Sequence, residues 1–118
     1  MAPGAADVIH PVDLRLDRSV DRTVVKLTGE VDLSNAAMVR RAIVESISNR
    51  DVDVAVDLSR VRYLDSAGIE MLFDLARRLA EHNQHLTMVL PSGSLVRRSL
   101  QASGWPTGVP VVETLEPR

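Results

Sequence analysis

The feature that most constrains the fold is a repeated change in the spacing of apolar residues along the chain. Segments in which apolar residues alternate with polar ones, or in which β-branched apolar residues follow one another, are typical of strands. Five such segments occur, at residues 12–16, 23–31, 52–58, 86–90 and 110–112. Between the later segments the apolar spacing lengthens to three and four residues, which is typical of amphipathic helices.

Three helices are predicted in these intervals. In the first, over residues 32–47, Asp32 and Ser34 are both suitable N-cap residues. The second begins near Ser66 and ends near residues 81–85, and Gly104 is well placed to end the third, over residues 94–103. The first helix has the apolar stripe Ala36, Val39, Ile43 and Ile47, and the second has the stripe Ile69, Leu72, Phe73, Ala76, Leu79 and Ala80.

The resulting order is β-β-α-β-α-β-α-β. Strands that alternate with helices imply right-handed crossovers onto a parallel sheet, and a first hairpin makes that sheet mixed. We therefore predict an α/β fold with a mixed, mostly parallel sheet and three main helices. The 118 residues suit one domain, expected at residues 10–115, between a flexible segment at 1–9 and a short tail at 116–118.

Composition excludes several classes of function. The chain has no cysteine, which excludes disulfides, thiolate zinc sites and cysteine nucleophiles. No apolar run approaches the roughly 18 residues of a membrane span, and the first ten residues do not resemble a secretion signal, so a cytoplasmic location is expected. The net charge of −2 provides no field that would attract nucleic acid.

The candidates for catalysis are weak. His10, His82 and His85 are the only histidines, and two of them near a helix end, without a clear third ligand, do not predict a metal site. His82 follows Ser66 by 16 residues in the same predicted helix, which separates them by about 24 Å and excludes a catalytic pair. No phosphate-binding glycine loop occurs. We therefore predict no enzyme activity, no metal and no cofactor.

Two further features have both structural and functional interpretations. Pairs of arginines occur on each predicted helix, at residues 40–41, 77–78 and 97–98. They form either a solvated helix surface or a docking site for an acidic partner. Trp105 follows a predicted helix end and is expected to cover the core.

The stretch "LDSAGIE", at residues 64–70, connects an apolar strand to the most regular helix. The first amide groups of a helix lack partners within the helix, and either Asp65 or Ser66 can accept hydrogen bonds from them. Ala67 and Gly68 are poor residues for a stable first turn, but they allow another backbone to approach. Physical reasoning alone leaves two interpretations open: an ordinary N-cap with small packing residues, or a contact site.

Three segments together resemble one known family. "LTGEVDLSNA" at residues 27–36 resembles a Gly-Glu-aliphatic-Asp segment, "AVDLSRVRYLDSAGIEML" at 55–72 resembles an Asp-Ser-x-Gly core motif, and "VRRSLQASGW" at 96–105 resembles a last helix. Their order and spacing are similar to those of STAS domains, specifically the bacterial anti-sigma factor antagonists. The resemblance covers residues 10–115 and implies a single STAS-like domain.

The resemblance implies a partner switch. The unphosphorylated antagonist binds an anti-sigma factor that is also an ATP-dependent serine kinase, and this binding releases a sigma factor. Phosphorylation ends the binding, and a serine phosphatase restores it. Carried onto this chain, Ser66 is the phosphoacceptor, and the partner-binding residues are Asp32, Asp65, Ser66, Ala67, Gly68 and Ile69. Asp32 is expected on a loop close to Ser66.

Other functions remain open. The main alternative is an accessory STAS subunit that docks the same helix on a transporter ATPase or permease without phosphorylation. A scaffold subunit of a signalling assembly is a third hypothesis, although such proteins usually carry a sensor domain. An enzyme with Ser66 as nucleophile is the weakest, because no base is within reach.

Overall fold

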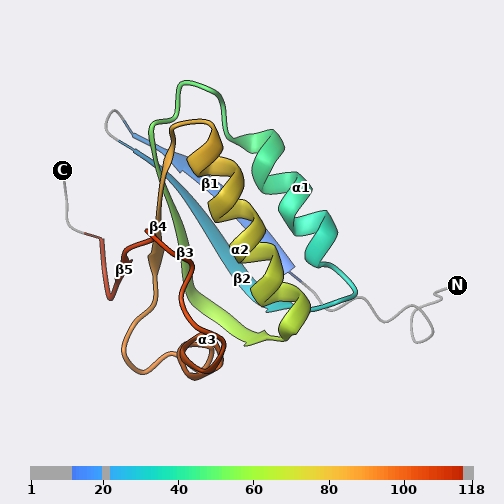
Figure 1. Ribbon diagram of the computed structural model, residues 1–118. Helices are drawn as coiled ribbons and strands as arrows, with labels where there is room; N and C mark the ends of the chain where they lie inside the picture. The colour runs from blue at the N-terminus through green and yellow to red at the C-terminus, as the bar shows by residue number, and fades with distance from the viewer. Residues whose placement is uncertain (1–11, 20–21, 116–118) are drawn as a thin grey trace, which may run out of the picture.

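The computed structural model describes residues 12–19 and 22–115. The flexible segment predicted at residues 1–9, the tail predicted at 116–118 and His10 lie outside the described residues. Figure 1 shows the described chain as a sheet with helices packed against it. The elements are β1 (Val12–Arg18), β2 (Thr23–Val31), α1 (Ala36–Ser46), β3 (Asp53–Leu64), α2 (Ser66–Glu81), β4 (His85–Val89), α3 (Arg97–Ser103) and β5 (Val111–Val112).

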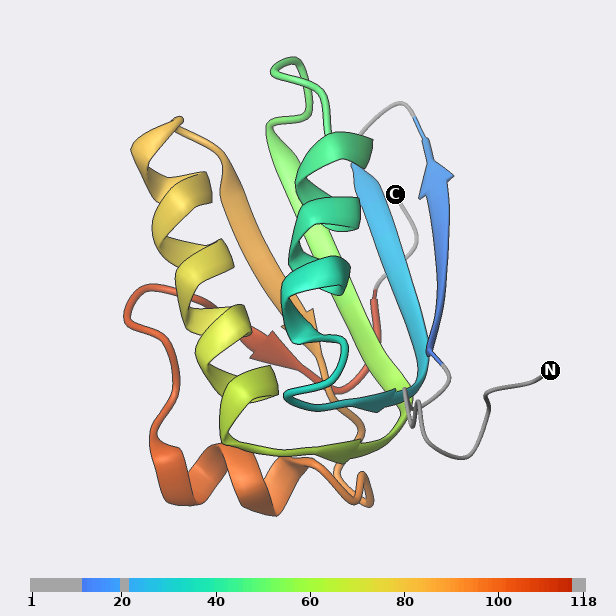
Figure 2. The ribbon, with the colours of Figure 1, turned by 90° about the vertical axis from the view of Figure 1, so that its right-hand side faces the viewer.

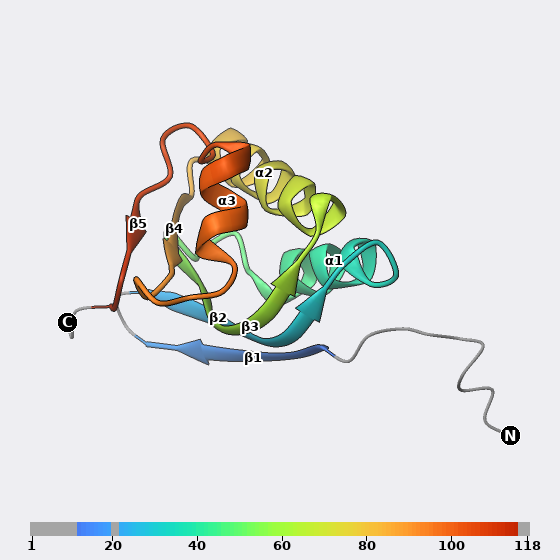
Figure 3. The same ribbon diagram turned by 90° about the horizontal axis from the view of Figure 1, so that it is seen from below.

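The sheet has the predicted mixed topology. Its strand order is β1-β2-β3-β4-β5, so each strand pairs with its neighbours in sequence. The first pair is an antiparallel hairpin, and the other three pairs are parallel. Each parallel connection carries a helix, and all three helices lie on one face of the sheet (Figures 2 and 3). The predicted fold class and order of elements are confirmed.

The core lies between the sheet and the helices. In β2, Val25, Leu27 and Val31 are buried in it, as the alternating pattern predicts. Partly buried apolar residues of β1, including Leu14 and Leu16, pack against it, while the polar residues between them are exposed. The predicted role of Trp105 is also confirmed: its ring packs against the core, with the Arg97 guanidinium 5.8 Å from the ring centre.

Two boundaries differ from the prediction by four residues or more. Strand β3 continues to Leu64 instead of ending at Leu58. The alternation is broken at Ser59 and Arg60 because the pairing with β2 shifts there, between Lys26 and Thr28. Helix α1 begins at Ala36, with Asn35 as N-cap and no capping bond from its side chain. Asp32 and Ser34 are therefore not N-caps, since both belong to the turn that precedes the helix.

The predicted apolar stripe of α2 is confirmed at Leu72, Ala76 and Leu79, but the buried side is rotated by about one residue from the rest of it. The buried residues are Gly68, Met71, Leu72, Leu75, Ala76 and Leu79. Phe73 and Ile69 are only partly buried, and Ala80 is exposed. Apolar residues occur on more than one side of this helix, so spacing alone could not select the side that faces the sheet. The packing of α2 against the sheet and α1 determines which side of the helix is buried.

Candidate functional site

The carboxyl ends of β2 and β3 bring the predicted site residues together at one edge of the sheet. The loop after β2 leads into α1, and Asp65 alone separates β3 from α2. These connections meet at the lower end of the ribbon in Figure 1. The Leu33 amide donates a hydrogen bond to Asp65 Oδ2 over 3.1 Å. The expectation that the loop of Asp32 lies close to the start of α2 is therefore confirmed.

Asp65 is the N-cap of α2. Its backbone is extended, and its Oδ1 accepts a hydrogen bond from the Gly68 amide at 3.0 Å. Its own amide donates to the Val31 carbonyl at 3.3 Å. One carboxylate thus holds the first turn of α2 and the loop after β2 at the same time. This decides between the two cap candidates, because Ser66 is the first residue inside the helix.

Ser66 is exposed at the positive end of the α2 dipole. Within the described part of the chain its hydroxyl has no hydrogen-bond partner. Because Asp65 supplies the cap, the Ser66 hydroxyl is not needed for the local fold. It is therefore accessible to another molecule, and a modification there would leave the cap in place.

Gly68 has an internal role. It is buried, and a Cβ at this position would lie 2.6 Å from Leu64 Cδ1 and 2.8 Å from the Val31 carbonyl oxygen. The backbone that approaches here is that of β2 in the same chain, which favours the packing interpretation of Gly68 over a contact with a partner. Ala67 and Ile69 are half-buried and pack against the core. Their remaining surface adjoins Ser66.

Asp32 is only 6% exposed, and its Oδ1 and its amide form hydrogen bonds inside its own loop. Its Oδ1 accepts hydrogen bonds from the Ser34 amide at 2.9 Å and from the Ser34 hydroxyl at 2.5 Å. Its amide donates to Asn35 Oδ1 at 3.0 Å. This burial argues against the prediction that the Asp32 carboxylate contacts a partner directly, and it assigns Asp32 to fixing the loop.

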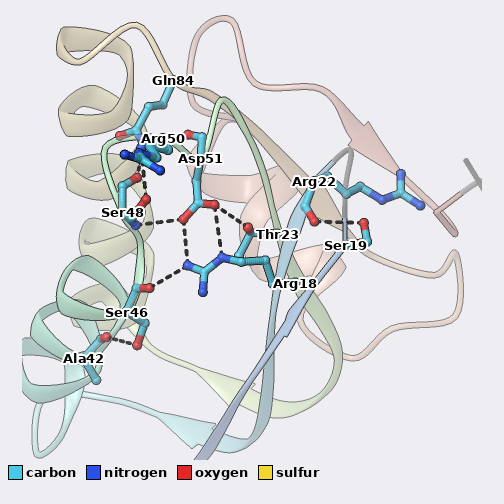
Figure 4. A network of polar contacts seen from close by, with 10 residues as sticks. All are labelled: Arg18, Ser19, Arg22, Thr23, Ala42, Ser46, Ser48, Arg50, Asp51 and Gln84. Carbon is cyan, nitrogen blue, oxygen red and sulfur yellow. Dashed lines mark hydrogen bonds and ion pairs between the residues drawn. The ribbon is translucent and has the colours of Figure 1, made fainter.

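A second polar cluster lies at the opposite edge of the sheet (Figure 4). Arg18 Nη2 is 2.8 Å from Asp51 Oδ2, and Asp51 also accepts from the Thr23 hydroxyl and the Ser48 amide. The hydrogen bond from Arg18 is the largest of the effects that lower the pKa of Asp51 to about 2. Sequence reasoning missed this cluster because Arg18 and Asp51 are 33 residues apart and belong to no local motif.

Several other residues that the sequence singled out make hydrogen bonds or ion pairs within the fold. His82 is the C-cap of α2, and its Nδ1 lies 2.8 Å from the Arg78 carbonyl. Arg97 donates to the Leu90 carbonyl at 2.7 Å, and Arg77 pairs with Asp74. Over residues 12–19 and 22–115, no group of three His, Cys, Asp or Glu side chains could hold a metal ion. In the same ranges no helix is long and apolar enough to cross a membrane.

The fold and the site define a class of small α/β domains in which a five-stranded mixed sheet presents a serine at the start of its second helix. The family model described as "Mlab, STAS domain" matches residues 14–113. The chain therefore belongs to the STAS domain family.

Comparison with individual proteins agrees with this family. The anti-sigma-F factor antagonist RsfB of Mycobacterium tuberculosis is 30% identical over 81 residues, which are 69% of this chain and 65% of the relative. The match thus spans less than two thirds of that curated relative. The solved structure of an anti-sigma factor antagonist from Mycobacterium paratuberculosis has a TM-score of 0.77 at 24% identity, covering 97% of this chain and 91% of the other.

The solved structures of the anti-sigma factor antagonist SpoIIAA share the fold in two chemical states. The unphosphorylated form has a TM-score of 0.66 at 20% identity and covers 85% of this chain and 88% of the other. The phosphorylated form of the Bacillus protein has a TM-score of 0.62 at 20% identity, with coverages of 85% and 91%. The same sheet and helices are thus found in a phosphorylated and an unphosphorylated neighbour.

Proposed function

We propose that this chain is an anti-sigma factor antagonist controlled by phosphorylation of Ser66. In its unphosphorylated form it binds an anti-sigma factor with ATP-dependent serine kinase activity and thereby releases a sigma factor. A serine phosphatase reverses the modification. The observation that carries the proposal is the exposed Ser66 hydroxyl. The neighbouring Asp65 caps the helix, so the hydroxyl is not needed for the fold. The similarity to RsfB supports the choice of partner.

Electrostatics explain how the phosphate would end binding. A phosphoserine carries about −1.5 to −2 charges at neutral pH. Opposite an acidic partner residue at about 5 Å, one such charge costs about 3 kcal/mol at an effective dielectric constant of about 20. A loss of that size weakens binding by about a hundredfold. The interface alone can therefore be switched, without any movement of α2.

The proposal is tested with purified anti-sigma factor kinases from the same organism. Wild type and Ser66→Ala should bind one of them, and Ser66→Glu should bind at least about tenfold more weakly, because the charge at the interface is repelled. Asn49→Glu is the matched control, since it adds the same charge at an exposed position in the turn before β3, at the opposite end of the sheet. With ATP, the kinase should transfer phosphate to wild type and not to Ser66→Ala. Equal binding by wild type, Ser66→Ala and Ser66→Glu would contradict the switch.

The second candidate is an accessory STAS subunit that docks on a transporter ATPase or permease. The observation that favours it is the matching family model, whose STAS domain is described by the name Mlab. A neighbouring gene for a transporter ATPase, in place of a small serine kinase, would support this candidate. Binding to that ATPase should be the same for wild type and Ser66→Ala, and it should need no ATP-dependent modification of the chain.

A further inference from the structure

Large apolar side chains are exposed mainly at the edge of the sheet that carries Ser66. Among the described residues, five large hydrophobic side chains are exposed, and Leu33 is the most exposed of them at 83%. Leu33, Met38, Tyr63 and Leu95 all belong to segments at the carboxyl edge of the parallel strands. The fifth, Val52, precedes β3 at the opposite edge and is 55% exposed. A single exposed leucine is ordinary, so the local structure around Leu33 must decide whether it has a role.

The polar side chains of the loop that carries Leu33 bond to one another and to the nearby backbone. The Ser34 hydroxyl donates to Asp32, and the Asn35 side chain accepts from the Asp32 amide and donates to the Glu30 carbonyl at 2.9 Å. The Asn35 amide donates to the Asp32 carbonyl. Loops in water usually have their polar groups outward. Here Leu33 is an apolar side chain, 83% exposed, in a turn that is closed by hydrogen bonds.

Asp65 fixes Leu33 relative to Ser66. The Leu33 amide is bonded to one oxygen of the Asp65 carboxylate, and the first turn of α2 is bonded to the other. Ser66 is the next residue in the chain. A protein that contacts the Ser66 hydroxyl therefore meets a leucine whose backbone is bonded to the residue before Ser66. Such preorganisation reduces the entropy lost on binding.

We propose that Leu33 is the apolar recognition residue of the surface that carries Ser66, and that an apolar pocket on the anti-sigma factor receives it. This inference rests on the proposed function and adds a specificity-determining residue to it. The occupant is the protein that covers Ser66 under the proposed function, because the Leu33 amide is bonded to Asp65, the residue that precedes Ser66. The occupant is therefore a protein that makes an apolar contact with Leu33 next to its phosphate-sensitive contact with Ser66.

The test is isothermal titration of the full chain with the anti-sigma factor that binds wild type. Leu33→Ser removes the apolar side chain and should raise the Kd by about ten- to a hundredfold. Leu33→Met keeps an apolar side chain of similar volume and should change the Kd by less than about threefold. Val52→Ser is the matched control, because it makes the same kind of change at the far edge of the sheet, and it should leave the Kd within about twofold. Circular dichroism checks that each variant is folded.

The possible outcomes separate this inference from the proposed function. If wild type binds no anti-sigma factor, the proposed function fails and Leu33 loses its assigned partner. If wild type binds and Leu33→Ser binds equally well, only the role of Leu33 is overturned. Sedimentation of the chain alone, and flotation with phosphatidylglycerol vesicles, complete the test. Self-association or vesicle binding that is lost in Leu33→Ser would show that the leucine serves a second copy or a membrane, and would overturn the assignment to an anti-sigma factor.

Discussion

Asp65 and Gly68 both shape the site, Asp65 through its carboxylate and Gly68 through the absence of a side chain. Asp65 bonds the start of α2 to the loop after β2. Gly68 lets the same helix approach the Val31 carbonyl so closely that no Cβ fits between them. The small residue in the motif is thus explained by internal packing. The modifiable residue, Ser66, lies between these two and serves neither purpose.

Gly68→Ala should therefore destabilise the protein. Alanine favours a helix over glycine by about 1 kcal/mol, but here its Cβ would overlap Leu64 and a backbone oxygen. Overpacking costs about 1 to 3 kcal/mol, and the upper part of that range, about 2 to 3 kcal/mol, applies here because the backbone oxygen cannot move aside. After the helix gain of about 1 kcal/mol is subtracted, we expect a net loss of about 1 to 2 kcal/mol in the free energy of unfolding, measured with urea. Gly93→Ala is the control, since nothing lies within 4 Å of its added Cβ. Equal stability of the two variants would refute the close approach of α2.

At the scale of elements, helix α2 contributes both to the stability of the fold and to the proposed regulation. Its cap is provided by Asp65, its first turn is closed by Gly68, and its inner side is buried against the sheet. None of these contacts involves the Ser66 hydroxyl. The helix should therefore tolerate a charged group at its first residue, and the interface alone should respond to it.

We expect phosphorylation of Ser66 to leave the helix content unchanged. The helix dipole favours an anion at the N-terminus by about 0.3 to 1 kcal/mol, which offsets repulsion from Asp65. Far-ultraviolet circular dichroism of the phosphorylated and unphosphorylated chains should therefore coincide. Loss of helical signal on phosphorylation would mean that the modification unfolds α2, and the account of an interface-only switch would be wrong. Ser66→Ala incubated with kinase and ATP controls for the treatment itself.

At the whole-molecule scale, a cluster of polar contacts connects several elements at the edge of the sheet opposite the site. Arg18 at the end of β1, Thr23 at the start of β2 and Ser48 after α1 all contact Asp51. Gln84, after α2, donates to the Asp51 carbonyl at 2.7 Å. This cluster joins the first hairpin to both large helices, and it lies apart from the surface that we assign to a partner.

The cluster predicts a pH dependence of folding. Because the pKa of Asp51 falls from 3.8 to about 2 on folding, its stabilisation is complete above pH 4 and is lost as the pH falls toward 2. Arg18 is partly exposed, so solvent screens the pair, and we expect a contribution of about 1 to 2 kcal/mol. Asp51→Asn should lower the free energy of unfolding by that amount at pH 7, and the difference from wild type should shrink below pH 4.

Urea unfolding between pH 7 and pH 2 measures this difference. Asp13→Asn is a suitable control, because Asp13 pairs with Arg15 on the exposed side of β1. Exposed pairs contribute little, so this variant should stay within about 0.5 kcal/mol of wild type at each pH. A gap between wild type and Asp51→Asn that does not change with pH would show that the ionised carboxylate is not what stabilises the cluster.

The sequence by itself determined the order of the elements, the hairpin, the parallel crossovers and the position of Ser66 at the start of α2. These follow from local spacing and from motifs within single segments, where the interacting residues are near one another in the chain. The tertiary structure alone decided which side of α2 is buried, why residue 68 is glycine, and that Asp65 holds Leu33 across 32 residues. It also decided the pairing of Arg18 with Asp51. Such contacts join segments that are distant in sequence, and their partners can be identified only after the strands are placed side by side.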